Sequence, residues 1–175
     1  MNDIETLKSV IRDIPDFPKE GIVFKDITPL LANADALKKT IDILKDRYAG
    51  KGITAVVGIE ARGFIFASAL AYALGAGTVL VRKPGKLPYK TFRQAYTLEY
   101  GTDAVEIHQD AFQPGQKIVI LDDVLATGGT VAATTNLIQN NFQAEIVEVA
   151  FLIELDFLKG REKIKDLPVF SLMHF

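Results

Sequence analysis

Short runs of aliphatic residues, separated by helix-length segments, constrain the fold of this chain more than any other feature. The runs cover 53–59 (ITAVVGI), 78–82, 117–121 (KIVIL) and 145–153 (EIVEVAFLI). Nearly continuous apolar runs of this length are typical of strands that are covered on both faces. Helical spacing of apolar residues lies between them, at about 34–48, 62–74 and 129–142. This alternation predicts an α/β fold with a mainly parallel central sheet flanked by helices. The length of 175 residues fits a single domain over 1–175.

The remaining segments have weaker patterns. Ile4, Leu7, Ile11 and Ile14 recur at helical spacing and predict a first helix that stops before Pro15. Residues 83–95 are basic and proline-containing, so we expect a loop there. A pair of strands over 96–100 and 104–108, a helical piece near 157–163 and an extended run over 169–172 complete the expected order.

Composition excludes several classes of protein. The chain has no cysteine and two histidines, which argues against disulfides, thiolate metal sites and a cysteine nucleophile. Its net charge of -2 argues against nucleic-acid binding by bulk charge. The longest apolar stretch, 63–77, is interrupted by glycine and shorter than the roughly 20 residues that span a bilayer. The first ten residues lack a signal-peptide pattern. We therefore expect a cytoplasmic protein that binds neither nucleic acid nor membrane.

In parallel sheets, ligands bind beyond the carboxyl ends of the strands, which directs attention to 59–63, 82–86, 121–130 and 153–156. The segment 118–131 (IVILDDVLATGGTV) is the most informative of these. Its loop and the following helix N-terminus offer backbone amides and hydroxyls to a single phosphate. The residues expected to bind that phosphate are Ala126, Thr127, Gly128, Gly129 and Thr130. The loop lacks the lysine of a Walker A loop and the spacing of a dinucleotide fingerprint.

Asp122 and Asp123 precede this loop. Two carboxylates beside a phosphate site suit a ligand that carries sugar hydroxyls, or a Mg²⁺ ion that they contact through water. Together with the loop they indicate a site for ribose 5-phosphate. The alternative is a pair of capping acids followed by an ordinary Gly-Gly turn.

This segment resembles the phosphoribosyl-pyrophosphate (PRPP) motif of type I phosphoribosyltransferases, which also occurs in regulators and in PRPP-synthesising enzymes. The wider chain resembles the adenine phosphoribosyltransferase family, in order and over nearly its whole length. The segments that carry this resemblance are FPKEGIVFKDITPLL (17–31), GIEARGF (58–64), VRKPGKLP (81–88), LEYG (98–101) and LKGREK (158–163). It implies conversion of adenine and PRPP to AMP and pyrophosphate by a homodimer, with Mg²⁺ held mainly by PRPP.

The resemblance also implies roles for individual residues. Glu99 would be the catalytic acid/base, and Arg62 would be both catalytic and a pyrophosphate ligand. Ala61, Arg82 and Lys86 would complete the pyrophosphate site. Separately, the basic composition of residues 83–95 is consistent with a lid that closes over PRPP. The aspartate pair would bind the ribose hydroxyls and stabilise an oxocarbenium-like sugar. The alternative for Glu99 is an exposed glutamate on a strand. The alternative for the basic residues over 82–93 is a loop exposed to solvent.

For adenine, the resemblance places the base against Val23, Phe24, Lys25 and Leu155. The backbone of Val23 and Lys25 would recognise the ring edge, and Phe24 and Leu155 would sandwich the ring. Periodicity alone is equally consistent with Phe24 and Leu155 as core residues. Lys25 stands where the family commonly has arginine, so that position keeps its charge and loses the guanidinium fork.

Two other functions share these features. One is transfer to another purine base, such as hypoxanthine, guanine or xanthine. The other is a non-catalytic regulator that senses PRPP or nucleotides on the same fold. A small NTPase-like phosphotransferase is disfavoured because the loop lacks a lysine.

Overall fold

Residues 2–98 and 101–175 are described from a computed structural model, and the chain divides into two compact units. The first unit is Met1–Arg47 and the second is Tyr48–Phe175. None of the helices in the described residues is both long enough and apolar enough to cross a membrane.

The first unit contains two short helices, one β-hairpin and most of the 15-residue helix α3. Its elements are α1 (Asp3–Ser9), β1 (Arg12–Pro15), β2 (Val23–Asp26), α2 (Thr28–Ala32) and α3 (Ala34–Tyr48), the last of which ends at the unit boundary. Asn2 caps α1 by accepting a hydrogen bond from the Glu5 amide at 2.9 Å.

The predicted helix over residues 4–14 is wrong beyond Ser9. Residues 12–15 form β1, which pairs antiparallel with β2 and sets Ile14 opposite Phe24. Pro15 disfavours the helical conformation at Ile14, and the hairpin gives the extended backbone its hydrogen-bond partners. The apolar residues therefore keep a helical spacing of three and four positions beyond Ser9, where the helix ends.

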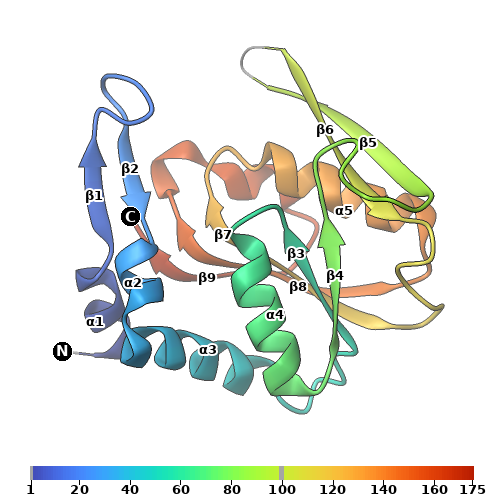
Figure 1. The fold of residues 1–175 in the computed structure, drawn as a ribbon, viewed down its shortest axis with the longest axis horizontal. Coiled ribbons are helices and arrows are strands. Elements are labelled where there is room, and N and C mark those ends of the chain that lie inside the picture. Colours follow the sequence, from blue (N-terminus) through green and yellow to red (C-terminus); the bar gives the residue numbers. More distant parts are fainter. Residues whose placement is uncertain (1, 99–100) are drawn as a thin grey trace. The chain divides into compact units, whose positions relative to one another are not determined.

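The second unit is organised around a five-stranded parallel sheet of order β4-β3-β7-β8-β9, which can be followed in Figure 1. The strands are β3 (Ala55–Ile59), β4 (Gly77–Val81), β7 (Lys117–Leu125), β8 (Glu145–Glu154) and β9 (Val169–His174). The predicted fold class, an α/β protein with a mainly parallel central sheet, is confirmed. β7 runs four residues beyond the predicted 117–121 and includes both aspartates.

Helices α4 (Gly63–Leu74) and α5 (Gly129–Asn141) cover opposite faces of this sheet. Gly58 lies against α4, since a Cβ atom added there would lie 2.9 Å from the Cβ of Ala67. The neighbouring Val57 and Ile59 point to the other face, where they belong to one buried core cluster with Val131 of α5. Both faces of β3 are therefore covered, which explains its uninterrupted apolar sequence.

An antiparallel hairpin of β5 (Thr91–Thr97) and β6 (Thr102–His108) lies alongside α5 and projects beyond the sheet (Figure 1). The rings of Phe92 and Phe142 meet edge to face at 5.4 Å between centroids. The predicted loop over 83–95 is therefore too long, because 91–95 already belong to β5. From Phe92 onward, side chains in β5 alternate between half-buried and exposed, and the exposed positions include the basic Arg93.

The predicted helical piece near 157–163 consists of two 3₁₀ helices, η1 (Asp156–Leu158) and η2 (Gly160–Ile164). They follow β8 and lead to β9. The position of η2 matters for the site, because its first residue touches the loop that follows β7.

Candidate active site

The loop between β7 and α5 is shaped by two glycines that touch. Gly128 has a φ of +78°, and a Cβ atom added to it would lie 2.4 Å from the carbonyl oxygen of Gly160. A Cβ atom on Gly160 would lie 2.2 Å from the carbonyl oxygen of Ala126. Both positions therefore require glycine, and η2 supports the loop directly through the backbone.

The loop presents donors to an anion. Helix α5 begins at Gly129 behind the N-cap residue Gly128, and no side chain caps it within the described part of the chain. Amides in the first turn of a helix have no partner inside the helix, and they lie at the positive end of the helix dipole. Uncapped amides at a glycine turn form a binding site for a phosphate group.

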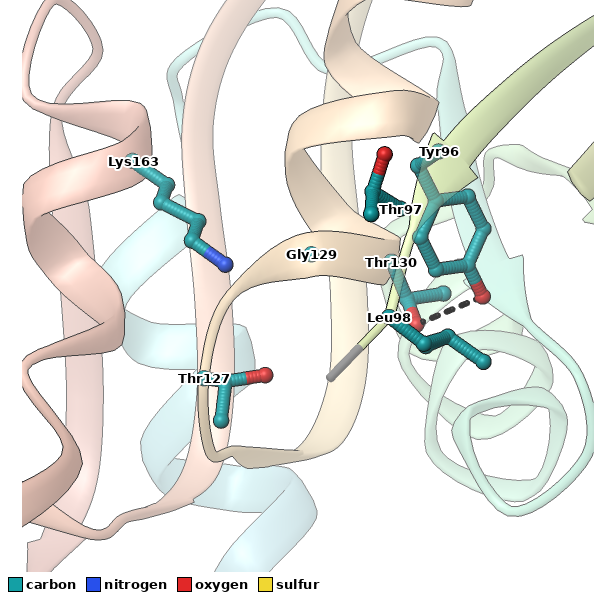
Figure 2. Close-up of a pocket in the computed structure, with 7 residues that line it drawn as sticks. All are labelled: Tyr96, Thr97, Leu98, Thr127, Gly129, Thr130 and Lys163. Atoms are coloured by element: carbon teal, nitrogen blue, oxygen red, sulfur yellow. Dashed lines mark hydrogen bonds between the residues drawn. The ribbon is translucent and has the colours of Figure 1, made fainter. Parts of the chain in front are cut away.

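Two hollows adjoin the loop. Asp122, Phe151 and the residues from Val124 to Val131 line a small cavity of about 100 Å³. A larger pocket of about 610 Å³, shown in Figure 2, falls in the size range typical of ligand sites. Its lining residues are Tyr96, Thr97, Leu98, Thr127, Gly129, Thr130 and Lys163. Because Thr127, Gly129 and Thr130 line both hollows, the loop is accessible from two sides.

The aspartate pair carries concentrated negative charge. The Asp122 carboxylate accepts a hydrogen bond from the Asp123 amide at 2.9 Å, and burial followed by the charge of Asp123 raises the pKa of Asp122 well above its usual value. Asp123 Oδ2 is buried and accepts no well-aligned hydrogen bond from the described residues, although Arg62 Nε lies 2.5 Å away. Such a pair favours ligands that bring hydroxyl protons or positive charge.

Gly63 lets α4 begin directly against these acids. A Cβ atom there would lie 2.8 Å from Asp122 Oδ1 and 2.9 Å from the Leu121 carbonyl oxygen. This close approach places Arg62, at the N-cap of α4, beside Asp123. The Glu60–Ala61 peptide that precedes Arg62 is cis.

A second cluster gathers around Glu60. Its carboxylate accepts hydrogen bonds from Lys86 Nζ at 2.6 Å, from the Lys83 amide at 2.8 Å and from Arg82 Nε at 3.3 Å. Burial alone would raise the pKa of Glu60, but these hydrogen bonds outweigh it and lower the pKa to about 2. Arg82 and Lys86, both predicted pyrophosphate ligands, are thus brought together by an acid that the sequence analysis did not single out.

Glu99, the predicted acid/base, lies outside the described residues. Thr97 and Leu98, which immediately precede it in the chain, line the larger pocket with Thr127 and Thr130. The segment leading to Glu99 is therefore next to the phosphate loop.

The residues predicted to bind the base belong to both units. In the first unit, Phe24 meets Phe17 edge to face at 5.2 Å, and Lys25 Nζ pairs with Asp13 at 2.7 Å. In the second unit, the Leu155 amide donates to the Leu125 carbonyl at 3.0 Å. Leu155 directly follows β8 and is half-buried.

Glu154, the last residue of β8, holds the chain beside Leu155. Its carboxylate accepts hydrogen bonds from Arg161 Nε at 3.0 Å and Arg161 Nη2 at 2.5 Å. Arg161 follows Gly160 in η2, so one ion pair ties the end of β8 to the segment that supports the phosphate loop.

Tyr96 connects the hairpin to α5 and was also missed. Its hydroxyl lies 3.1 Å from Thr130 Oγ1, accepts from Lys83 Nζ at 2.9 Å, and donates to Asp103 at 3.2 Å. Figure 2 shows the Tyr96–Thr130 contact at one wall of the pocket. The alternating pattern of β5 was the only sequence signal that placed Tyr96 facing inward.

Known proteins match this chain over almost its full length. The phosphoribosyl transferase domain family matches residues 26–173. The adenine phosphoribosyltransferase of Syntrophotalea carbinolica is 61% identical over 172 residues, covering 98% of this chain and 100% of that protein.

Solved structures agree with the sequence matches. The adenine phosphoribosyltransferase of Thermoanaerobacter pseudethanolicus superposes with a TM-score of 0.94 at 49% identity, covering 98% of this chain and 99% of that one. The enzyme from Saccharomyces cerevisiae, in complex with an imino-altritol bisphosphate and adenine, has a TM-score of 0.92 at 42% identity, with 98% of each chain covered.

Proposed function

The chain belongs to the adenine phosphoribosyltransferase family, and from this premise we propose how its own residues convert adenine and PRPP to AMP and pyrophosphate. In this transfer a bond forms between adenine N9 and ribose C1, and the bond from C1 to the pyrophosphate oxygen breaks. Pyrophosphate leaves with the electron pair, and adenine loses the N9 proton. The observation that carries the proposal is an aspartate pair, with Asp122 half-buried and Asp123 buried, beside an uncapped, glycine-supported phosphate loop.

The ribose 5-phosphate half of PRPP binds to this loop. Amides and hydroxyls from Ala126, Thr127, Gly128, Gly129 and Thr130 bind the 5-phosphate. The carboxylates of Asp122 and Asp123 accept hydrogen bonds from the ribose hydroxyls and stabilise the positive charge that develops on the sugar ring. Because these charges are fixed before the reaction, little reorganisation accompanies bond breaking.

Pyrophosphate is bound by Ala61, Arg62, Arg82 and Lys86. The guanidinium groups suit phosphate oxygens because they donate two parallel hydrogen bonds. Glu60 holds Arg82 and Lys86 in the structure described here, at 3.3 Å and 2.6 Å. Pyrophosphate would compete with Glu60 for these cations, which limits how tightly the product is held.

Glu99 acts as the acid/base that manages the purine protons. From the family resemblance, Val23, Phe24, Lys25 and Leu155 are the residues that bind adenine. Because Lys25 pairs with Asp13, we expect its backbone rather than its ammonium group to recognise the base.

Mg²⁺ fits this site, held mainly by oxygens of PRPP. Asp122 and Asp123 bring two carboxylates together beside the loop, and carboxylates are ligands that Mg²⁺ accepts directly or through water. When bound with PRPP, the ion would offset the negative charge that accumulates on the leaving pyrophosphate. A homodimer, from the family resemblance, and a cytoplasmic location, from composition, complete the proposal.

A product assay tests it. The purified chain is mixed with PRPP and Mg²⁺, and adenine, hypoxanthine, guanine and xanthine are supplied separately. We expect AMP from adenine alone, and loss of turnover in Glu99→Ala. IMP, GMP or XMP as the main product would contradict the adenine site, and PRPP binding without any product would favour the regulator.

A further inference from the structure

Lys163 supplies a positive charge to the pocket beside the phosphate loop. Figure 2 shows its side chain extending from η2 toward Gly129, opposite the wall formed by Tyr96 and Leu98. The ammonium nitrogen lies 4.0 Å from the position that a Cβ atom on Gly129 would occupy. It therefore reaches the first turn of α5, where the uncapped amides are.

The ion pairing of Lys163 differs from that of the other basic residues near the site. Arg62 contacts Asp123, and Arg82 and Lys86 contact Glu60, so a carboxylate already offsets each of those cations. Lys163 forms no ion pair or hydrogen bond with any of the residues that the structure describes. Lys163 is thus a basic side chain that lines the pocket and that meets no carboxylate among residues 2–98 and 101–175.

The position of Lys163 is coupled to the loop. Gly160, the first residue of η2, packs its backbone against Ala126 and Gly128, and Ile164, next to Lys163, is only 4% exposed. A buried anchor on one side and a backbone contact on the other fix this short helix relative to the loop. A lysine held there stays within reach of the loop despite its flexible stem.

We propose that Lys163 binds the 5-phosphate of PRPP and of AMP, supplying the charge that the loop itself lacks; this rests on the proposed function. The 5-phosphate carries close to two negative charges, and Asp122 and Asp123 add to the unfavourable field around it. An ammonium group on the open side of the loop offsets that field and forms a charge-assisted hydrogen bond. Lys163 thereby discriminates phosphorylated from unphosphorylated ribose ligands.

Lys163→Gln tests the proposal, with Lys163→Arg as the conservative variant and Lys165→Gln as the matched control. Lys165 is also an exposed lysine, it is the C-cap residue of the same 3₁₀ helix, and it does not line the pocket. We expect Lys163→Gln to raise the KM for PRPP and the Kd for AMP about tenfold, the size of one charged hydrogen bond. The KM for adenine and the Kd for adenosine should stay unchanged. Lys163→Arg should recover most of the affinity.

The salt dependence of AMP binding separates charge from structure. Removing a phosphate contact should flatten the fall of AMP affinity with ionic strength, which a merely structural change would not do. Equal AMP affinity and equal salt dependence in Lys163→Gln and Lys165→Gln would overturn the role of Lys163. Failure of the wild-type chain to form AMP would instead refute the proposed function. Calorimetry measures AMP binding without turnover, so it tests the role of Lys163 independently of catalysis.

Discussion

Replacing Gly128 by alanine should destabilise the protein more than the left-handed backbone at this position would by itself, because the new side chain would also clash with Gly160. Gly115 is the matched control, because its φ of +81° is almost that of Gly128 at +78°, while a Cβ atom on Gly115 would meet nothing within 4 Å. A left-handed backbone costs an alanine about 1–2 kcal/mol, partly offset by the lower entropy of the unfolded chain. We therefore expect Gly115→Ala to lose about 1 kcal/mol of stability.

Gly128→Ala adds a steric term. Its Cβ would lie 2.4 Å from the carbonyl oxygen of Gly160, below the 3.0 Å that real Cβ atoms essentially never cross, and the obstructing atoms are backbone. Overpacking of this kind typically costs a further 1–3 kcal/mol. For a chain of this length we expect Tm to fall by about 2–4 °C in Gly115→Ala and by about 4–16 °C in Gly128→Ala.

The clash in Gly128→Ala should also displace the phosphate loop and so impair function. Moving catalytic or binding groups by about 1 Å commonly costs about 100-fold in rate, so we expect kcat/KM for PRPP to fall by about that factor in Gly128→Ala. Gly115→Ala should retain it. Differential scanning calorimetry and steady-state kinetics measure both effects. Equal Tm and equal kcat/KM in the two variants would refute the view that the Gly128–Gly160 contact sets the loop.

Three further predictions concern charge and hydrogen bonding in the site. The pKa of Glu60 is about 2, below its ordinary 4.5, so its ionised form stabilises the fold above pH 4.5 and this contribution is lost as pH falls toward 2. Urea titrations should therefore find Glu60→Gln less stable than wild type by about 1 kcal/mol at pH 6, after allowing for solvent screening, with the difference shrinking at pH 2–3. Asp123→Asn should lower kcat about 100-fold with a smaller change in the KM for PRPP, since its charge acts on the transition state; a KM effect alone would contradict this. Tyr96→Phe should raise the KM for PRPP a few-fold, and a double-mutant cycle with Thr130→Val should be non-additive.

Much of the second unit could be predicted from local sequence. The core strands could be recognised because burial on both faces demands continuous apolar residues, as in 53–59. The phosphate loop could be recognised because glycine, threonine and a helix start are adjacent in the chain. The first helix was overextended because the pairing of Ile14 with Phe24, ten positions along the chain, outweighs helical spacing.

Other features depend on partners that are distant in the sequence. Glu60 meets Lys86 across 26 positions, and Tyr96 meets Thr130 across 34. Lys163 is brought to the loop by a contact between two glycine backbones, which no side-chain pattern records. Such residues become visible only when the fold brings separate segments together.

The most direct measurement of the central claim is the nucleotide formed from PRPP and each of four purine bases. We predict AMP from adenine, formed in equal amount to pyrophosphate, and no nucleotide from hypoxanthine, guanine or xanthine. A chain that binds PRPP and forms no nucleotide, or that forms IMP, GMP or XMP in preference to AMP, would contradict it.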